Sequence, residues 1–79
     1  MPLNFANFDG PVIDARELEP PEPFVRTMAA LDDVGPGQSL YLVLPREPFP
    51  LYNALAMNGF THDTTYSDDG LVVVRIFRP

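Results

Sequence analysis

The sequence lacks cysteine, tryptophan and lysine, and it contains a single histidine. Without cysteine, the chain cannot form a disulfide bond, supply a thiol nucleophile or act as a redox dithiol. One histidine without cysteine also excludes a zinc site of the usual Cys/His type. We therefore expect neither a metal nor a cofactor, and the stability of the fold must come from one hydrophobic core.

Positive charge and long apolar runs are also scarce. Five basic residues stand against eleven acidic ones, giving a formal net charge of −6 at pH 7, and the arginines are scattered at positions 16, 26, 46, 75 and 78. Phosphate binding needs clustered positive charge, so we expect no nucleic-acid partner. The longest apolar run, residues 40–44, is far shorter than the roughly 20 residues of a membrane helix, so we expect no membrane partner.

The ends and the length of the chain bound its organisation. The first residues lack the basic start and the apolar stretch of a secretory signal, and a cytoplasmic location is therefore expected. A length of 79 residues allows one domain. We expect an irregular N-terminal arm at residues 1–11 and a single domain at residues 12–79.

Ten prolines divide the chain into short segments. A residue that precedes proline disfavours helical geometry, so the first helix can begin only within residues 18–23 or after them. The apolar positions that follow helical spacing, and that we expect to face the core, are Phe24, Val25, Met28, Leu31 and Val34. We expect Gly35 to end this helix in a left-handed cap conformation, because Pro36 prevents continuation.

Four strands and a second helix complete the pattern. Strands are predicted at residues 12–15, 39–44, 60–67 and 71–77, and a helix is predicted at residues 51–58. Asp69-Gly70 predicts a tight turn between the last two strands. The order β-α-β-α-β-β predicts right-handed crossovers and a closing antiparallel hairpin. We expect an α/β (α+β) two-layer sandwich, in which a mixed four-stranded sheet carries two helices on one face.

Alternation along the strands separates two faces of this sheet. The aliphatic set expected to face the helices is Leu40, Leu42, Leu44, Val72, Val74 and Ile76. The opposite set, expected to be exposed on the open face, is Tyr41, Val43, Val73 and Phe77. Three interpretations remain open: Phe5 and Phe8 of the arm fold across this face, its apolar residues sit singly among polar neighbours without a role, or the face binds a protein partner or a second copy in a weak homodimer.

Residues 13–23 resemble the TusA/SirA-like sulfur-carrier family. That family has an aspartate after the first strand and a Cys-Pro-x-Pro motif that opens the first helix, and Asp14, Leu18, Pro21 and Pro23 match at the family's spacing. The resemblance extends over residues 12–77 and implies the same element order that the residue patterns predict.

Two departures from the family pattern decide what the resemblance implies. The family glycine is Glu17 here, and the sulfur-accepting cysteine is Pro20. Proline has no nucleophilic atom, so the chain cannot relay sulfur. The sequence is more similar to a Cys-less bacterial branch of the superfamily, a domain of unknown function, which also has segments like residues 16–20 and 50–52. A link to redox or nitrogen-oxide metabolism is implied by that resemblance.

No catalytic site emerges from the other polar residues. His62 lies among alternating strand residues and is expected to be a surface or half-buried side chain. The adjacent carboxylates Asp32-Asp33 and Asp68-Asp69 are expected to be solvated. We therefore expect no enzyme activity, with a carboxylate-based enzyme as a weaker alternative.

Two binding surfaces remain besides the open sheet face. Pro20, Pro21 and Pro23 stiffen the start of the first helix, with Glu22 and Arg26 on one flank, and this segment is either a rigid helix start or a docking edge for a protein partner. The leading hypothesis is a non-catalytic interaction or regulatory module. The alternative is a pocket for a small anionic ligand, formed by the same segment with Arg46 and Tyr52.

Overall fold

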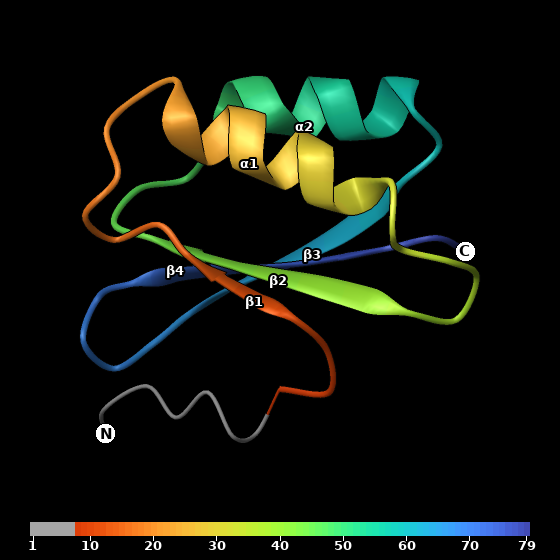
Figure 1. Ribbon diagram of the computed structural model, residues 1–79. Coiled ribbons are helices and arrows are strands. Elements are labelled where there is room, and N and C mark those ends of the chain that lie inside the picture. Colours follow the sequence, from red (N-terminus) through yellow and green to blue (C-terminus); the bar gives the residue numbers. More distant parts are fainter. Residues whose placement is uncertain (1–7) are drawn as a thin grey trace.

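The six expected helices and strands are all present in the computed structural model, which describes residues 8–79 (Figure 1). They are β1 (Val12–Asp14), α1 (Glu22–Leu31), β2 (Ser39–Leu44), α2 (Phe49–Met57), β3 (Thr61–Tyr66) and β4 (Val72–Phe77). Both helices cover the same face of the sheet, so the predicted two-layer α+β sandwich is confirmed. Residues 8–11 form neither helix nor strand, and residues 1–7 of the expected arm lie outside the described part of the chain.

The sheet has the strand order β1-β2-β4-β3. β1 is parallel to β2, whereas β4 is antiparallel to both β2 and β3. The last strand in sequence is thus inserted beside β2. Burial explains this position: β4 is almost entirely buried, as central strands are, while the threonine-rich β3 is largely exposed and forms an edge.

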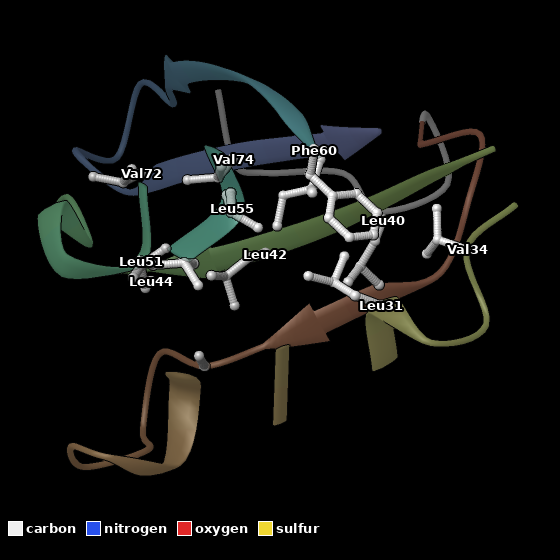
Figure 2. Close-up of a cluster of buried hydrophobic side chains, with 12 residues drawn as sticks. Leu31, Val34, Leu40, Leu42, Leu44, Leu51, Leu55, Phe60, Val72 and Val74 are labelled. Carbon is white, nitrogen blue, oxygen red and sulfur yellow. The ribbon is translucent and has the colours of Figure 1, made fainter. Parts of the chain in front are cut away.

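The core lies between the sheet and the two helices. The sheet contributes the predicted aliphatic set, and α2 contributes Leu51 and Leu55, which point toward it (Figure 2). Leu42, Leu55, Val74 and Ile76 have no exposed surface. The predicted inward face of the sheet is therefore correct at every position.

The predicted inward face of α1 is partly wrong. Leu31 and the following Val34 are buried, but the other fully buried position of the helix is Thr27, which is not among the positions expected to face the core. Phe24 and Val25 are 39% and 58% exposed. Thr27 and Leu31 are four residues apart and so share one face of the helix, and this narrow stripe packs on the sheet while Phe24 lies beside a cavity.

The end of α1 also differs from the prediction. The helix ends at Leu31, and Asp32 still has right-handed helical geometry. Gly35 does not take a positive φ; its N–H instead donates to the side-chain Oε1 of Gln38 at 2.8 Å. Gly37, with φ 80°, adopts the left-handed conformation instead, where the chain turns into β2.

Candidate functional site

Both helices begin at the same end of the sheet (Figure 1). Each start carries a Pro-x-Pro sequence: Pro21 is the N-cap of α1, with Pro23 in its first turn, and Pro48 is the N-cap of α2, with Pro50 in its first turn. Proline suits a first helical turn because its missing N–H would have had no intrahelical partner. The two proline-rich starts therefore lie at the end of the sheet where β1 and β2 terminate.

A cavity of about 370 Å³ lies between these two helix starts. Its lining residues are Ala15, Pro20, Pro21, Pro23, Phe24, Leu42, Leu44, Pro45, Arg46, Glu47, Pro48, Pro50 and Leu51. The volume falls within the range of small-molecule and side-chain binding sites, about 300–1,000 Å³. Apart from Arg46 and Glu47, the wall consists of aliphatic, proline and phenyl groups, which favours an apolar occupant.

The helix starts offer few free backbone donors to this cavity. Proline supplies no N–H, the Glu22 N–H donates to the carbonyl of Glu19 at 2.9 Å, and the Leu51 N–H donates to the carbonyl of Pro48 at 2.9 Å. Free N–H groups are what normally allow a helix N-terminus to bind an anion. Neither helix start is therefore suited to hold a phosphate or carboxylate by its backbone.

Two charged residues are among those that line the cavity. Arg46 is exposed and makes no ion pair with the residues that the structure describes. Glu47 is half-buried, and its Oε1 accepts a hydrogen bond from the Tyr52 hydroxyl at 3.2 Å. The same carboxylate raises the pKa of Tyr66, chiefly through hydrogen bonding. Glu47 is thus held by aromatic neighbours, whereas Arg46 has no such contact among the described residues.

Tyr52 faces away from the cavity. Its hydroxyl lies 2.6 Å from Oγ1 of Thr64, and its ring stacks on His62 with the centroids 4.1 Å apart. Burial raises the pKa of Tyr52. The expectation that Arg46 and Tyr52 line one pocket is wrong, because the tyrosine is turned toward β3 by these contacts. His62 is half-buried on β3, as the strand pattern predicted.

Comparison with known proteins places this fold in a family. The model of an uncharacterised conserved protein family, DUF2249, matches residues 12–78. The chain belongs to the DUF2249 family. No curated protein matches the sequence.

A solved structure of a SirA-like protein from Desulfitobacterium hafniense is similar to this DUF2249 domain. The two share 23% sequence identity with a TM-score of 0.74, over 84% of this chain and 93% of the other. The resemblance to the TusA/SirA-like superfamily is thereby confirmed at the level of the fold. The DUF2249 chain contains no cysteine, and Pro20 in the cavity wall is the residue that the resemblance places at the sulfur-accepting position.

Asp14, which also matches the superfamily pattern, has a local partner. Its carboxylate accepts two hydrogen bonds from the Arg16 side chain, at 2.8 and 2.6 Å. Hydrogen bonding to Arg16 lowers the pKa of Asp14. The pair lies at the surface at the end of β1, ahead of the proline segment of the DUF2249 cavity.

Some residues at the start of α1 line the cavity, and others lie on the outer surface. Pro20, Pro21 and Pro23 line the cavity, whereas Glu22 and Arg26 do not. The two charged residues are exposed and form no ion pair with each other. The predicted docking edge therefore has an apolar inner side and a charged outer side.

The open sheet face of the DUF2249 domain is less exposed than predicted. Val43 is 0% and Val73 is 7% exposed, so the expectation that both are exposed is wrong. They are cross-strand neighbours on the central strands β2 and β4. Tyr41 and Phe77 are half-buried, and no helix of residues 8–79 covers this face (Figure 1).

The described part of the arm contacts this face. The Phe8 ring stacks on Tyr41 with the centroids 4.5 Å apart, and the Tyr41 hydroxyl donates to Asp9, which raises the pKa of Tyr41. The Arg75 guanidinium lies 4.2 Å from the centre of the Phe77 ring. Phe8 thus takes the place expected of the arm, while Phe5 lies outside the described residues.

Residues 8–79 offer no metal-binding cluster as an alternative site. They contain no group of three or more histidines and carboxylates placed to hold a metal ion. None of the helices in this stretch is long and apolar enough to cross a membrane. The cavity and its two bordering charges are the main candidate site, and only the position of Pro20, Pro21, Pro23 and Arg46 was anticipated from the sequence.

Glu47 was not anticipated as a site residue. The position of its carboxylate depends on the hydroxyl of Tyr52 on α2. That hydroxyl is itself held by Thr64 on β3. The only local signal was a carboxylate immediately before a Pro-x-Pro helix start. A contact between α2 and β3 cannot be read from helical or strand periodicity.

Proposed function

We propose that this DUF2249 domain is a non-catalytic interaction or regulatory module, which receives an apolar group of a partner protein in the cavity between its two helix starts. The observation that carries the proposal is the apolar cavity of about 370 Å³. Its position supports the proposal as well, because open α/β sheets bind ligands outside the carboxyl ends of their strands.

The chemistry of the wall supports binding rather than reaction. Pro20 stands where the resemblance places a reactive cysteine, and a saturated ring supplies neither a nucleophile nor an acid or base. Proline-rich walls lose little conformational entropy when they are covered, which favours association. A link to redox or nitrogen-oxide metabolism would then come from the partner.

Site-specific photo-crosslinking in the native cells tests this proposal. Benzoylphenylalanine replaces Phe24, which lines the cavity, or Val25, which is 58% exposed on the same helix and lies outside the cavity. We expect a discrete protein adduct from position 24 and little or none from position 25. Identical adduct patterns at the two positions, or no adduct at either, would contradict the proposal.

A small anionic ligand is the second candidate occupant. Arg46 favours it, because this exposed guanidinium borders the cavity without an ion-pair partner among the described residues. The proline helix starts oppose it by withholding backbone donors. A carboxylate or phosphate that raises the thermal midpoint of the wild type, but not of Arg46→Gln, would favour the ligand over the protein partner.

The weak homodimer through the open sheet face stays a prediction. Burial of Val43 and Val73 leaves the half-buried Tyr41 and Phe77 as its main apolar contacts. Phe8 already occupies one side of Tyr41. The cavity is therefore the better supported surface for a partner.

A further inference from the structure

The outer side of β3 is an open edge of the sheet. The strand order β1-β2-β4-β3 leaves this side without a neighbouring strand among residues 8–79. β3 pairs with β4 at all six of its residues without a bulge, whereas the other edge strand, β1, has only three residues and follows Pro11. Proteins prevent strand addition with short edges, prolines, bulges and lysines, and β3 has none of these.

The backbone of β3 offers hydrogen-bonding groups along this edge. The Ser67 N–H donates to the carbonyl of Leu71 at 2.9 Å, so the backbone groups of residue 67 point toward β4. These groups alternate in direction along a strand, and every second residue of β3 therefore points its N–H and carbonyl outward. The outward residues are His62, Thr64 and Tyr66. Within residues 8–79, their outward groups have no hydrogen-bond partner.

The edge is complementary to itself when two copies of β3 lie antiparallel with Thr64 opposite Thr64. His62 of one copy then lies opposite Tyr66 of the other, and every outward group of both edges is paired. His62 and Thr64 contact Tyr52 on the helix side of the sheet, and strand alternation places Tyr66 on the same side. Tyr66, which is 64% exposed in one copy, thereby gains an aromatic cross-strand neighbour.

Charge and backbone pairing favour this register over the adjacent one. A pairing centred on Asp63 would set two carboxylates opposite each other, which destabilises a sheet. It would also set Tyr66 opposite Phe60, whose N–H already donates to the carbonyl of Leu55 at 2.9 Å. With Thr64 at the centre, Asp63 instead lies opposite Thr65 of the second copy, whose hydroxyl can donate to the carboxylate.

We propose that the chain forms a weak, two-fold symmetric homodimer through the edges of β3, with the symmetry axis at Thr64. The same surface of each copy is used, as in most symmetric dimers. The two four-stranded sheets become continuous, and the helices of both copies lie on one side. This interface differs from the open sheet face and from the cavity, so the inference goes beyond the proposed function.

Disulfide cross-linking tests the register, because the chain contains no cysteine of its own. In Thr64→Cys, the two Cα atoms would lie about 5.5 Å apart, within the range that a disulfide bridges. We expect oxidation to yield a covalent dimer. The matched control is Thr61→Cys on the same strand, whose Cα atoms would lie about 20 Å apart, and this variant is expected to stay monomeric.

Sedimentation equilibrium tests the role of the backbone edge. Thr64→Pro removes the outward N–H, which an edge strand tolerates, and is expected to raise the dissociation constant of the dimer at least about tenfold. Thr64→Val is the matched control, because it loses the hydroxyl that contacts Tyr52 but keeps the N–H, and it is expected to dimerise like the wild type. Added salt is expected to strengthen the dimer, since each copy carries a net charge of −6.

Three results would overturn the inference. They are a wild type that stays monomeric up to about 1 mM in high salt, equal cross-linking at positions 61 and 64, and a dimer that Thr64→Pro does not weaken. Thermal midpoints show whether each variant is folded, and if Thr64→Pro does not fold, the two cysteine variants decide alone. None of these variants alters the cavity wall, so a failure here leaves the proposed function standing.

Discussion

Proline shapes the candidate site at the scale of single residues. Pro21 and Pro48 cap the two helices, and each helix has a second proline in its first turn. These rings remove the N–H groups that would attract an anion, and they present apolar surface instead. Pro20 adds a wall that can contact an occupant but has no atom with which to react.

Thr27 is the residue whose environment fits it least. It is fully buried in α1, and its Oγ1 has no hydrogen-bond partner among the described residues. A buried hydroxyl without a partner costs free energy relative to a methyl group of similar shape. We expect Thr27→Val to raise the free energy of unfolding by about 1 kcal/mol.

Urea denaturation measures this change as a higher midpoint with an unchanged slope. The matched control is Thr65→Val, because Thr65 is exposed on β3 and its hydroxyl is already solvated. The control is expected to change stability by less than about 0.5 kcal/mol. A destabilised Thr27→Val would show that the hydroxyl contributes a hydrogen bond to the fold.

At the scale of elements, the strands follow their sequence patterns more closely than the helices do. Residues 39–44 form a strand as predicted, because alternating leucines face a helix layer on one side only. The predicted inward face of α1 is partly wrong, since the proline start and the cavity beside it leave Phe24 uncovered. Which residue packs inward there depends on tertiary contacts that periodicity does not contain.

The open face of the sheet yields a prediction at the same scale. Val73 on β4 is 7% exposed, so an aspartate there would place a charge in a largely buried position. We expect Val73→Asp to destabilise the fold by about 3 kcal/mol or more, measured by urea denaturation. Thr65→Asp, at its exposed cross-strand neighbour on β3, is the matched control and is expected to cost much less.

A Val73→Asp variant that keeps wild-type stability would contradict the burial of this position. If such a variant also changed from dimer to monomer, the open face would become the main interaction surface. We expect a loss of stability first, because Val43 and Val73 support each other across the two central strands.

At the scale of the whole molecule, topology creates the candidate site. β1 runs parallel to β2, and β3 has the same direction because β4 is antiparallel to both β2 and β3. Each helix crosses from one of these parallel strands to the next, so both helices begin at one end of the sheet (Figure 1). The cavity forms there, between two proline-rich starts.

The element order predicted the sandwich but not its strand order. The patterns of β3 and β4 predict a hairpin, whereas the insertion of β4 between β2 and β3 follows from its burial on both faces. The sequence placed Pro20, Pro21, Pro23 and Arg46 near one another because both segments precede helices. It did not place Tyr52 toward β3 or assign a role to Glu47, since both depend on the hydroxyl of Thr64.

The amide NMR spectrum of the ¹⁵N-labelled chain, recorded with and without a peptide selected by binding, tests the binding role of the cavity most directly. We predict shifts concentrated at residues that line the cavity and have an amide proton, namely Ala15, Phe24, Leu42, Leu44, Arg46, Glu47 and Leu51. The amide signals of residues on the open sheet face, such as Tyr41 and Arg75, are predicted not to shift. Shifts confined to that open face, with the cavity amides unmoved, would contradict a binding role for the cavity.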